Sequence, residues 1–198
     1  MKIAIIGKGN MGSGLAKLAS QAGHTVLVGS RDPAQSPLAA IQEAELVILA
    51  VPYAAALALA EDAAARHALA GKTVIDITNP LAADYMSLTI GHSTSAGEEI
   101  AKRLPGVKVV KAFNTLFADV VSLRAAGAKV AATVLVAGDD EDAKRTIIEL
   151  ASSFGFESVD AGALSNARYL EPITEQLIHL AYVKGLGTKI GFALVRIT

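Results

Sequence analysis

The sequence of 198 residues predicts an α/β fold built on a doubly wound, mainly parallel β-sheet. Two observations support this prediction. Short β-branched runs alternate with Ala- and Leu-rich stretches of helical spacing, which is the pattern of a sheet layered with helices. Several of the runs are apolar throughout, as expected for parallel strands that helices cover on both faces. The alternation predicts a strand order that begins 3-2-1-4.

The predicted elements follow one another regularly. Strands are expected at Ile3–Ile6, Thr25–Val28, Leu46–Ala50, Thr73–Ile77, Val107–Lys111 and Ala132–Val136. Helices are expected at Met11–Ala22, Pro37–Glu43, Ala54–Ala68, Ala96–Leu104 and Glu141–Phe154. Helix N-caps are expected at Ser95 and at Asp139 or Asp140, and a left-handed C-cap at Gly23.

The pattern changes after Gly162. Leu164–Val183 is a long, mostly apolar helical stretch that Pro172 interrupts, and a tail with regularly spaced glycines follows it. We therefore expect residues 1–160 to form one doubly wound domain and residues 161–198 to form a short helix-plus-tail extension. Arg168 and Glu171 are spaced to form a surface ion pair on the predicted helix.

Composition narrows the possible functions. A net charge of −1 argues against a nucleic-acid or anionic-membrane partner, because both are usually met by a basic surface. The absence of cysteine excludes thiol catalysis, disulfides and thiolate metal sites. The longest apolar run, Leu46–Ala60, is too short to span a membrane and contains Pro52. We expect a cytoplasmic protein with no membrane or nucleic-acid partner.

A glycine pattern predicts a dinucleotide site. Gly7, Gly9 and Gly12 form G-x-G-x-x-G directly after an apolar strand and at the start of a predicted helix. In this context the first glycine permits a tight turn, the second lets a pyrophosphate approach the backbone, and the third lets helix and strand pack closely. The predicted domain of residues 1–160 is therefore of the Rossmann type.

The end of the second predicted strand favours NADP(H) over NAD(H). An NAD site usually has an acidic residue there, which bonds the ribose hydroxyls and repels a 2′-phosphate. This chain has Gly29-Ser30-Arg31 instead. Gly29 leaves room, Ser30 can donate a hydrogen bond, and Arg31 can form a charge-assisted pair with the phosphate. Asp32 is expected to face solvent or to cap a turn.

Further cofactor contacts are expected from loops that follow the other strands. These residues are Ala50, Val51 and Pro52 after the third strand, Asn79 and Pro80 after the fourth, and Ala112, Phe113 and Asn114 after the fifth. Carboxyl ends of parallel strands meet at one edge of a sheet, so these loops are expected to lie together. The loops after the fourth and fifth strands are expected nearest the nicotinamide.

No catalytic residue and no metal site are predicted. The chain lacks a Tyr-x-x-x-Lys pair, and its four histidines have neither metal-ligand spacing nor an evident carboxylate partner. A reaction in which the protein only holds two rings face to face fits this pattern, such as hydride exchange between a nicotinamide and a flavin or deazaflavin. Two alternatives remain: a non-catalytic NADP(H)-binding redox sensor, and a small-carbonyl or imine reductase with Tyr169 or Asp84 as proton donor.

Several segments resemble the NADPH-dependent coenzyme F420 reductase family. They are "IAIIGKGNMGSGLAKLASQAGHTVLVGSRDP", "VILAVPY", "DITNPL", "LPGVKVVKAFNTL" and "ARYLEPITEQLIHLAYVKGLGTKIGFALVR", which together span nearly the whole chain. The resemblance implies a Rossmann domain with a small C-terminal extension. It also implies reversible hydride transfer between NADP(H) and the deazaflavin, with an ordinary flavin as the other candidate acceptor.

The resemblance also implies roles for particular residues. Gly9, Asn10 and Met11 would bind the pyrophosphate, Ser30 and Arg31 the 2′-phosphate, Val51 the ribose region, and Ala112 the nicotinamide. Members of the family are often dimeric, so we expect a homodimer. The extension at residues 161–198 is expected to complete the substrate site and to form the dimer interface.

Overall fold

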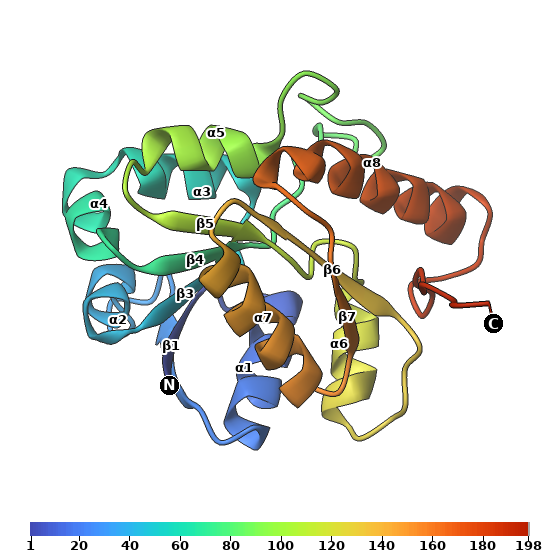
Figure 1. Cartoon of the computed structure of the whole chain (residues 1–198), viewed down its shortest axis with the longest axis horizontal. Coiled ribbons are helices and arrows are strands. Elements are labelled where there is room, and N and C mark those ends of the chain that lie inside the picture. The colour runs from blue at the N-terminus through green and yellow to red at the C-terminus, as the bar shows by residue number, and fades with distance from the viewer. Residues whose placement is uncertain (198) are drawn as a thin grey trace.

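The computed structural model describes residues 1–197, in which a seven-stranded sheet is covered by helices on both faces (Figure 1). The strands are β1 (Lys2–Ile6), β2 (Thr25–Gly29), β3 (Leu46–Leu49), β4 (Thr73–Asp76), β5 (Lys108–Lys111), β6 (Thr133–Gly138) and β7 (Glu157–Asp160). The α-helices are α1 (Asn10–Gln21), α2 (Pro37–Glu43), α3 (Tyr53–Glu61), α4 (Ala63–Leu69), α5 (Ala96–Arg103), α6 (Ala118–Ala125), α7 (Glu141–Ser153) and α8 (Ala167–Ile178). Thr198, the last residue of the predicted extension, lies outside the described residues.

The order of the strands differs from the prediction. The sheet runs β2-β1-β3-β4-β5-β6-β7, so the predicted beginning 3-2-1-4 is wrong. The chain leaves β2 through the short helix α2 and crosses back, and β3 then pairs with β1, with Ile3 opposite Leu46. Burial explains why β3 lies inside the sheet and β2 at its edge. Every residue of β3 is buried, whereas β2 is mostly half-buried, as is usual for an edge strand.

The sheet is parallel except at one junction. β5 and β6 run antiparallel, and all other neighbouring strands run parallel, which confirms a mainly parallel sheet. The edge strand β7 and the helix α6 were not among the predicted elements. β7 is short and half-exposed, with the burial pattern of an edge, so it carries little of the apolar signal that marks a central strand.

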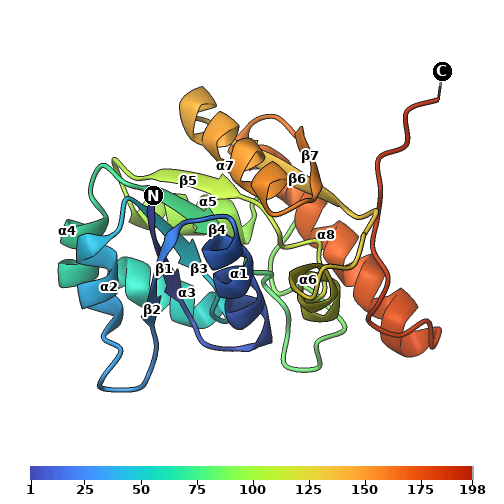
Figure 2. The same ribbon diagram turned by 90° about the horizontal axis from the view of Figure 1, so that it is seen from below.

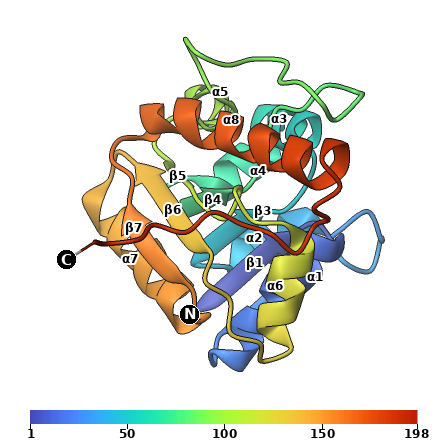
Figure 3. The same ribbon diagram turned by 90° about the vertical axis from the view of Figure 1, so that its right-hand side faces the viewer.

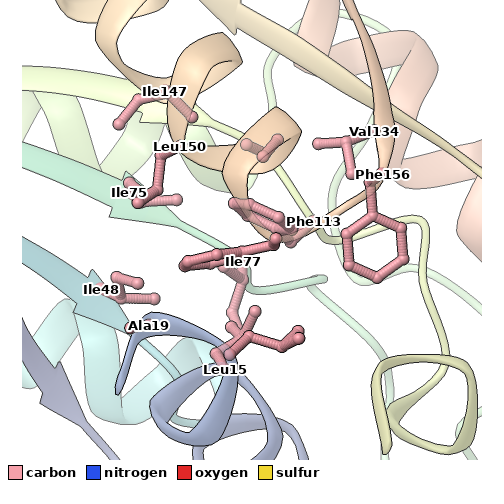
Figure 4. Close-up of a cluster of buried hydrophobic side chains, with 14 of the residues drawn as sticks. Leu15, Ala19, Ile48, Ile75, Ile77, Phe113, Val134, Ile147, Leu150 and Phe156 are labelled. Carbon is pink, nitrogen blue, oxygen red and sulfur yellow. The ribbon is translucent and has the colours of Figure 1, made fainter. Parts of the chain in front are cut away.

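Side chains that alternate along the strands build two hydrophobic cores. In β1, Ile3 and Ile5 belong to one core, and Ala4 and Ile6 belong to the other. The first core joins the sheet to α1, α6 and α7, and Figure 4 shows Leu15, Ile75, Phe113 and Leu150 of this core close together. The second core joins the sheet to α2, α3, α4 and α5. The helices therefore form one layer on each face, as predicted for a doubly wound sheet.

Local signals account for most helix ends. The predicted caps at Ser95 and Asp140 are confirmed, since their side chains accept hydrogen bonds from the N–H groups of Glu98 and Ala143. Gly23 has the left-handed φ of 83° expected after the first helix. The single helix predicted at Ala54–Ala68 is two helices, because Asp62 is extended and its side chain caps α4 at the N–H of Ala65, 2.7 Å away.

The C-terminal segment lies across the end of the sheet. A 3₁₀ turn (Leu164–Asn166) leads into α8, and α8 continues as a π-helix (His179–Val183), which matches the predicted helical stretch. Figure 3 shows α8 lying beside α5 and the tail returning below it. The end of the tail extends away from the sheet (Figure 2). At the start of β6, the N–H of Thr133 donates to the carbonyl oxygen of Phe192 in the tail, and the Thr133 hydroxyl accepts from the N–H of Leu194.

Candidate active site

The glycine turn lies where β1 and β3 run side by side and their crossovers leave toward opposite faces. Gly7 has a φ of 120°, and a Cβ placed there would lie 2.0 Å from the carbonyl oxygen of Ala50. A Cβ on Gly12 would lie 2.1 Å from the carbonyl oxygen of Gly7. Only glycine fits at these two positions. Such a crevice, beyond the carboxyl ends of diverging parallel strands, is where open α/β sheets bind their ligands.

The helix that follows the turn presents its N-terminus to this crevice. Gly9 is the N-cap of α1, and no side chain among residues 1–197 caps the helix. Nothing lies within 4 Å of a Cβ placed on Gly9, so this side of the turn is open. Gly9 and Asn10 are exposed and Met11 is half-buried. Free N–H groups and the positive end of the helix dipole make such a terminus an anion site, which suits the pyrophosphate that the sequence predicts here.

The loop after β2 holds Ser30 and leaves Arg31 exposed. The Ser30 hydroxyl donates to the Gln35 side chain at 2.9 Å and accepts from the N–H of Asp32 at 3.1 Å. Arg31 is exposed and forms no ion pair with the described residues. The Asp32 carboxylate caps a turn at the N–H of Ala34, as expected. The predicted pair of Ser30 and Arg31 thus stands at the carboxyl edge of the sheet, where a 2′-phosphate would be received.

The space at Gly29 has a different use from the one predicted. A Cβ there would lie 2.7 Å from the Cα of Pro37 and 2.8 Å from the Cδ1 of Ile6. Gly29 therefore makes room for the start of α2 and for the core, rather than for a ligand. The expectation that it leaves room for a phosphate is wrong.

A cleft of about 600 Å³ opens beside the glycine turn. It unites the loops that follow β3, β4 and β5 with the start of α1 and one side of α8, and its lining is mostly apolar. Of the predicted cofactor residues, the cleft is lined by Met11, Val51, Pro52, Asn79, Phe113 and Asn114. Tyr53, Thr78, Tyr85, Phe117, Thr174 and Ile178 also line it, and sequence reasoning did not select them.

Three of the residues predicted in the loops after the third, fourth and fifth strands do not line this cleft. Ala112 is fully buried in the first core, and its N–H donates to the carbonyl oxygen of Asp76 at 3.2 Å. Pro80 is also buried, and its carbonyl oxygen accepts from Thr89. Ala50 lies between the two regions, where it packs against Gly7 and Gly12. These three residues shape the loops, and their roles as cofactor contacts stay predictions.

A pair of asparagines joins two of the loops at the inner end of the cleft. The amide of Asn114 donates to the Oδ1 of Asn79 at 3.0 Å, and the amide of Asn79 donates to the carbonyl oxygen of Asn114 at 3.2 Å. Phe113, just before, is buried with a φ of 61°, a left-handed conformation that a bulky residue rarely adopts. Strain of this kind persists where the surrounding structure enforces it, and it is commonest at functional sites.

The same region holds polar atoms without partners. Among the described residues, the Thr78 hydroxyl and the Oδ1 of Asn114 are buried without a hydrogen-bond partner, and both residues line the cleft. An unpaired buried polar atom costs about 1–3 kcal/mol, so such atoms usually meet a ligand or water. Burial also raises the pKa of the Tyr53 hydroxyl, which keeps this lining side chain neutral.

The predicted surface ion pair between Arg168 and Glu171 is wrong. Arg168 pairs with Glu98 of α5 through two hydrogen bonds of 2.8 and 2.6 Å, and this contact holds the pKa of the Glu98 carboxyl below its ordinary value. Glu171 is 1% exposed and points inward, where its carboxylate lies 2.8 Å from the ammonium of Lys111. Helical spacing places both side chains on one helix but does not show which one faces the sheet.

The proton donors considered in the sequence lie elsewhere. Tyr169 is exposed on the far side of α8, and Asp84 accepts hydrogen bonds within its own loop, from Met86 and Ser87. Neither of them lines the cleft. The His179 ring lies 2.9 Å from the carbonyl oxygen of Met86 and so ties this loop to the π-helix.

Within residues 1–197, no group of three or more His, Cys, Asp or Glu side chains is placed to hold a metal ion. No helix in the same range is long and apolar enough to cross a membrane.

A glycine turn on a mainly parallel α/β sheet, with a cleft built from the neighbouring strand ends, defines a dinucleotide-binding oxidoreductase of the Rossmann type. Residues 2–40 and 34–80 match the family described as NADP oxidoreductase coenzyme F420-dependent. The whole chain is 34% identical to the F420-dependent NADP reductase of Methanothermobacter marburgensis and covers 98% of it. The protein therefore belongs to the family of coenzyme F420-dependent NADP oxidoreductases.

Two other comparisons differ in how much of the matched protein this chain covers. A crystal structure from Arthrobacter sp. FB24, provisionally assigned as an F420-dependent NADP reductase, superposes with a TM-score of 0.86 at 33% identity and covers 99% of this chain and 100% of its own. Metalloreductase STEAP3 of Rattus norvegicus is 32% identical over 89% of this chain. The chain spans 37% of the length of that metalloreductase.

Proposed function

We propose that the protein transfers a hydride between NADP(H) and coenzyme F420, a deazaflavin. The observation that carries this proposal is the lining of the cleft, which among the described residues contains no Asp, Glu, His, Lys or Arg. Its ionisable side chains are Tyr53 and Tyr85, and burial raises the pKa of Tyr53, which makes this hydroxyl a weaker acid. Reduction of a carbonyl or imine usually needs a proton donor at the reacting atom. Hydride transfer between two stacked rings needs mainly orientation and the exclusion of water.

The residues of this chain would divide the work between two regions. The turn at Gly7 and the N-terminus of α1 would hold the pyrophosphate, and Arg31 would hold the 2′-phosphate. The cleft would receive the reacting rings between its apolar walls, with Asn79 and Asn114 at its inner end. When bound, NADPH would supply a hydride, and the deazaflavin would accept it together with a proton from solvent.

The polar atoms of the cleft fit this role. The free Thr78 hydroxyl and Asn114 Oδ1 can bond a carboxamide or a ring N–H, and they are the buried groups that line the cleft without a partner in the described chain. Relatives support the acceptor as well as the cofactor, since the Methanothermobacter marburgensis protein is an F420-dependent NADP reductase that this chain matches over 98% of its length.

Absorbance assays test the proposal. Under anaerobic conditions, the protein is mixed with NADPH and, in turn, with coenzyme F420, riboflavin, FMN, FAD and a panel of carbonyls and imines. We expect NADPH oxidation with F420 at a rate far above that with the other acceptors. Turnover with a flavin alone would show that a flavin, and not F420, is the hydride acceptor. Turnover with an imine or carbonyl alone would overturn the proposal. Tight NADPH binding with no turnover at all would make the protein a redox sensor.

We also propose that residues 161–198 form a homodimer interface and complete the acceptor side of the site. Apolar side chains on this segment are exposed, among them Tyr182, Leu186, Leu194 and Val195. Exposed apolar patches of this kind mark interaction surfaces. Light scattering after size-exclusion chromatography should give a dimer for the wild type and a monomer for Leu194→Glu/Val195→Glu. A wild-type monomer would refute the interface. We place the protein in the cytoplasm, because NADP(H) is kept inside the cell.

A further inference from the structure

Three charged side chains are buried together directly behind the cleft. Lys111, the last residue of β5, places its ammonium 2.9 Å from the carboxylate of Asp76 and 2.8 Å from the carboxylate of Glu171. Asp76 and Lys111 are fully buried and Glu171 is 1% exposed, and none of the three lines the cleft. Asp76 ends β4, Lys111 ends β5, and Glu171 belongs to α8. We call these three residues the buried charge cluster.

The buried charge cluster is complete only when three elements are in register. Two carboxylates and one ammonium leave a net charge of −1, which is costly in the interior unless it is compensated. The compensation comes from α5, since the N–H groups of Ala96 and Gly97 donate to the Glu171 carboxylate at 3.0 and 3.2 Å. These groups form the positive end of the α5 dipole. Movement of α8 would therefore leave a buried charge without its partners.

One path leads from the cluster to the loop after β4. The N–H of Thr78 donates to the Asp76 carboxylate at 2.8 Å, and the Lys111 ammonium donates to the carbonyl oxygen of Thr78. Both backbone groups of Thr78 are thereby fixed by the cluster. The next residue is Asn79, which bonds Asn114 and lines the cleft.

A second path runs along α8. Thr174 lies three residues after Glu171, on the same side of the helix, and its hydroxyl donates to the carbonyl oxygen of Asn114 at 3.1 Å. Ile178, one turn further, lines the cleft. Glu171 fixes the position of the helix, and the following two turns form one wall of the site.

We propose that the buried charge cluster is a positioning device that sets the acceptor wall of the cleft, with Glu171 as its positioning residue. This inference rests on the proposed hydride transfer. The cofactor's phosphate groups would be held at the glycine turn and Arg31, on the far strands of the sheet, so the cluster acts on the acceptor and the nicotinamide rather than on overall NADPH affinity.

The test uses Glu171→Gln, with Glu175→Gln on the same helix as the matched control. Glutamine keeps the size of the side chain and leaves the Asp76–Lys111 pair neutral overall, so the variant is expected to fold. We expect kcat/KM for coenzyme F420 to fall about tenfold, since small displacements of reacting groups cost at least that much, while the Kd for NADPH stays within about twofold. The control should match the wild type in both quantities.

Hydrogen–deuterium exchange gives a readout that does not depend on turnover. In Glu171→Gln, exchange should rise in α8 and in the loop around Asn114 and should stay unchanged in α1. An unchanged kcat/KM, an equal loss for F420 and NADPH, or unchanged exchange in α8 would each overturn the inference. If Glu171→Gln does not fold, Asp76→Asn serves in the same assays. If the wild type shows no F420 turnover, the proposed function fails, while the exchange experiment still tests the cluster.

Discussion

Asn79 and Asn114 hold each other by two hydrogen bonds across the carboxyl ends of β4 and β5. Each side-chain amide donates to the other residue, at 3.2 Å from Asn79 and 3.0 Å from Asn114. The amide of Asn114 also lies 3.1 Å from the carbonyl oxygen of Leu170 on α8. The pair therefore joins two loops of the sheet to the helix that closes the cleft.

A double-mutant cycle measures this coupling. Asn79→Ala and Asn114→Ala should each lower the free energy of unfolding, Asn114→Ala by about 2–3 kcal/mol because it removes the amide that donates to the Asn79 Oδ1 and to the Thr174 hydroxyl. The double variant should lose at least about 1 kcal/mol less than the sum of the single losses, as expected for residues in direct contact. Urea denaturation gives all three values. Additive losses would show that the two side chains do not depend on each other.

Sequence reasoning located this region because the relevant signals are local or follow from strand topology. The glycine turn needs only residues 7–12 to be recognised. Asn79 and Asn114 were expected close together because each follows an apolar strand, and parallel strands end at one edge. Neither inference required knowledge of which helix covers the edge.

The features that the sequence did not predict depend on long-range packing. Glu171 contacts Lys111, 60 residues away in the chain, and no periodic pattern distinguishes its inward orientation from that of a surface residue. A signal did exist for the other half of the cluster: Asp76 and Lys111 both end apolar strands, and they lie opposite each other in the sheet. An opposite pair of charges at the same level of neighbouring buried strands is a clue to a buried ion pair. The strand order was missed because it depends on whether the third strand pairs with the free edge of β2 or with that of β1.

Two glycines of the turn should respond differently to alanine. Gly7→Ala places a Cβ against the Ala50 carbonyl oxygen at a strained φ, so it should lower the melting temperature by several degrees, at a cost of at least about 2 kcal/mol. Gly9→Ala meets no atom within 4 Å and should melt like the wild type. Its methyl group would still occupy the face expected to meet the pyrophosphate, so NADPH affinity should fall. Differential scanning fluorimetry and fluorescence titration provide the two measurements. Equal melting temperatures for the two variants would contradict the geometry of the turn.

Acid should weaken the first turn of α5. Hydrogen bonds from Lys102, Thr94 and Arg103 lower the pKa of Glu99 from 4.5 to about 2. A carboxyl with a lowered folded-state pKa stabilises the fold fully above its unfolded pKa and loses this contribution as the pH falls. The contribution of Glu99 should therefore disappear between pH 4.5 and pH 2. In Glu99→Gln, the melting temperature should depend less on pH across this window, as followed by circular dichroism. A variant curve parallel to that of the wild type would show that Glu99 does not titrate with folding.

The selectivity for the phosphorylated cofactor should depend on Arg31. The guanidinium is exposed at the end of β2 and forms no ion pair with the residues that the structure describes, so it is available to a 2′-phosphate. A charge-assisted hydrogen bond of this kind contributes about 1.5–3 kcal/mol, which corresponds to a tenfold or larger rise in the KM for NADPH in Arg31→Ala. The KM for NADH, which lacks the phosphate, should change little. Lys8→Ala, which removes an exposed cation from the glycine turn itself, is the matched control and should affect the two cofactors alike. Steady-state kinetics with each cofactor test this prediction. An equal effect of Arg31→Ala on the KM for NADPH and the KM for NADH would mean that Arg31 does not bind the 2′-phosphate.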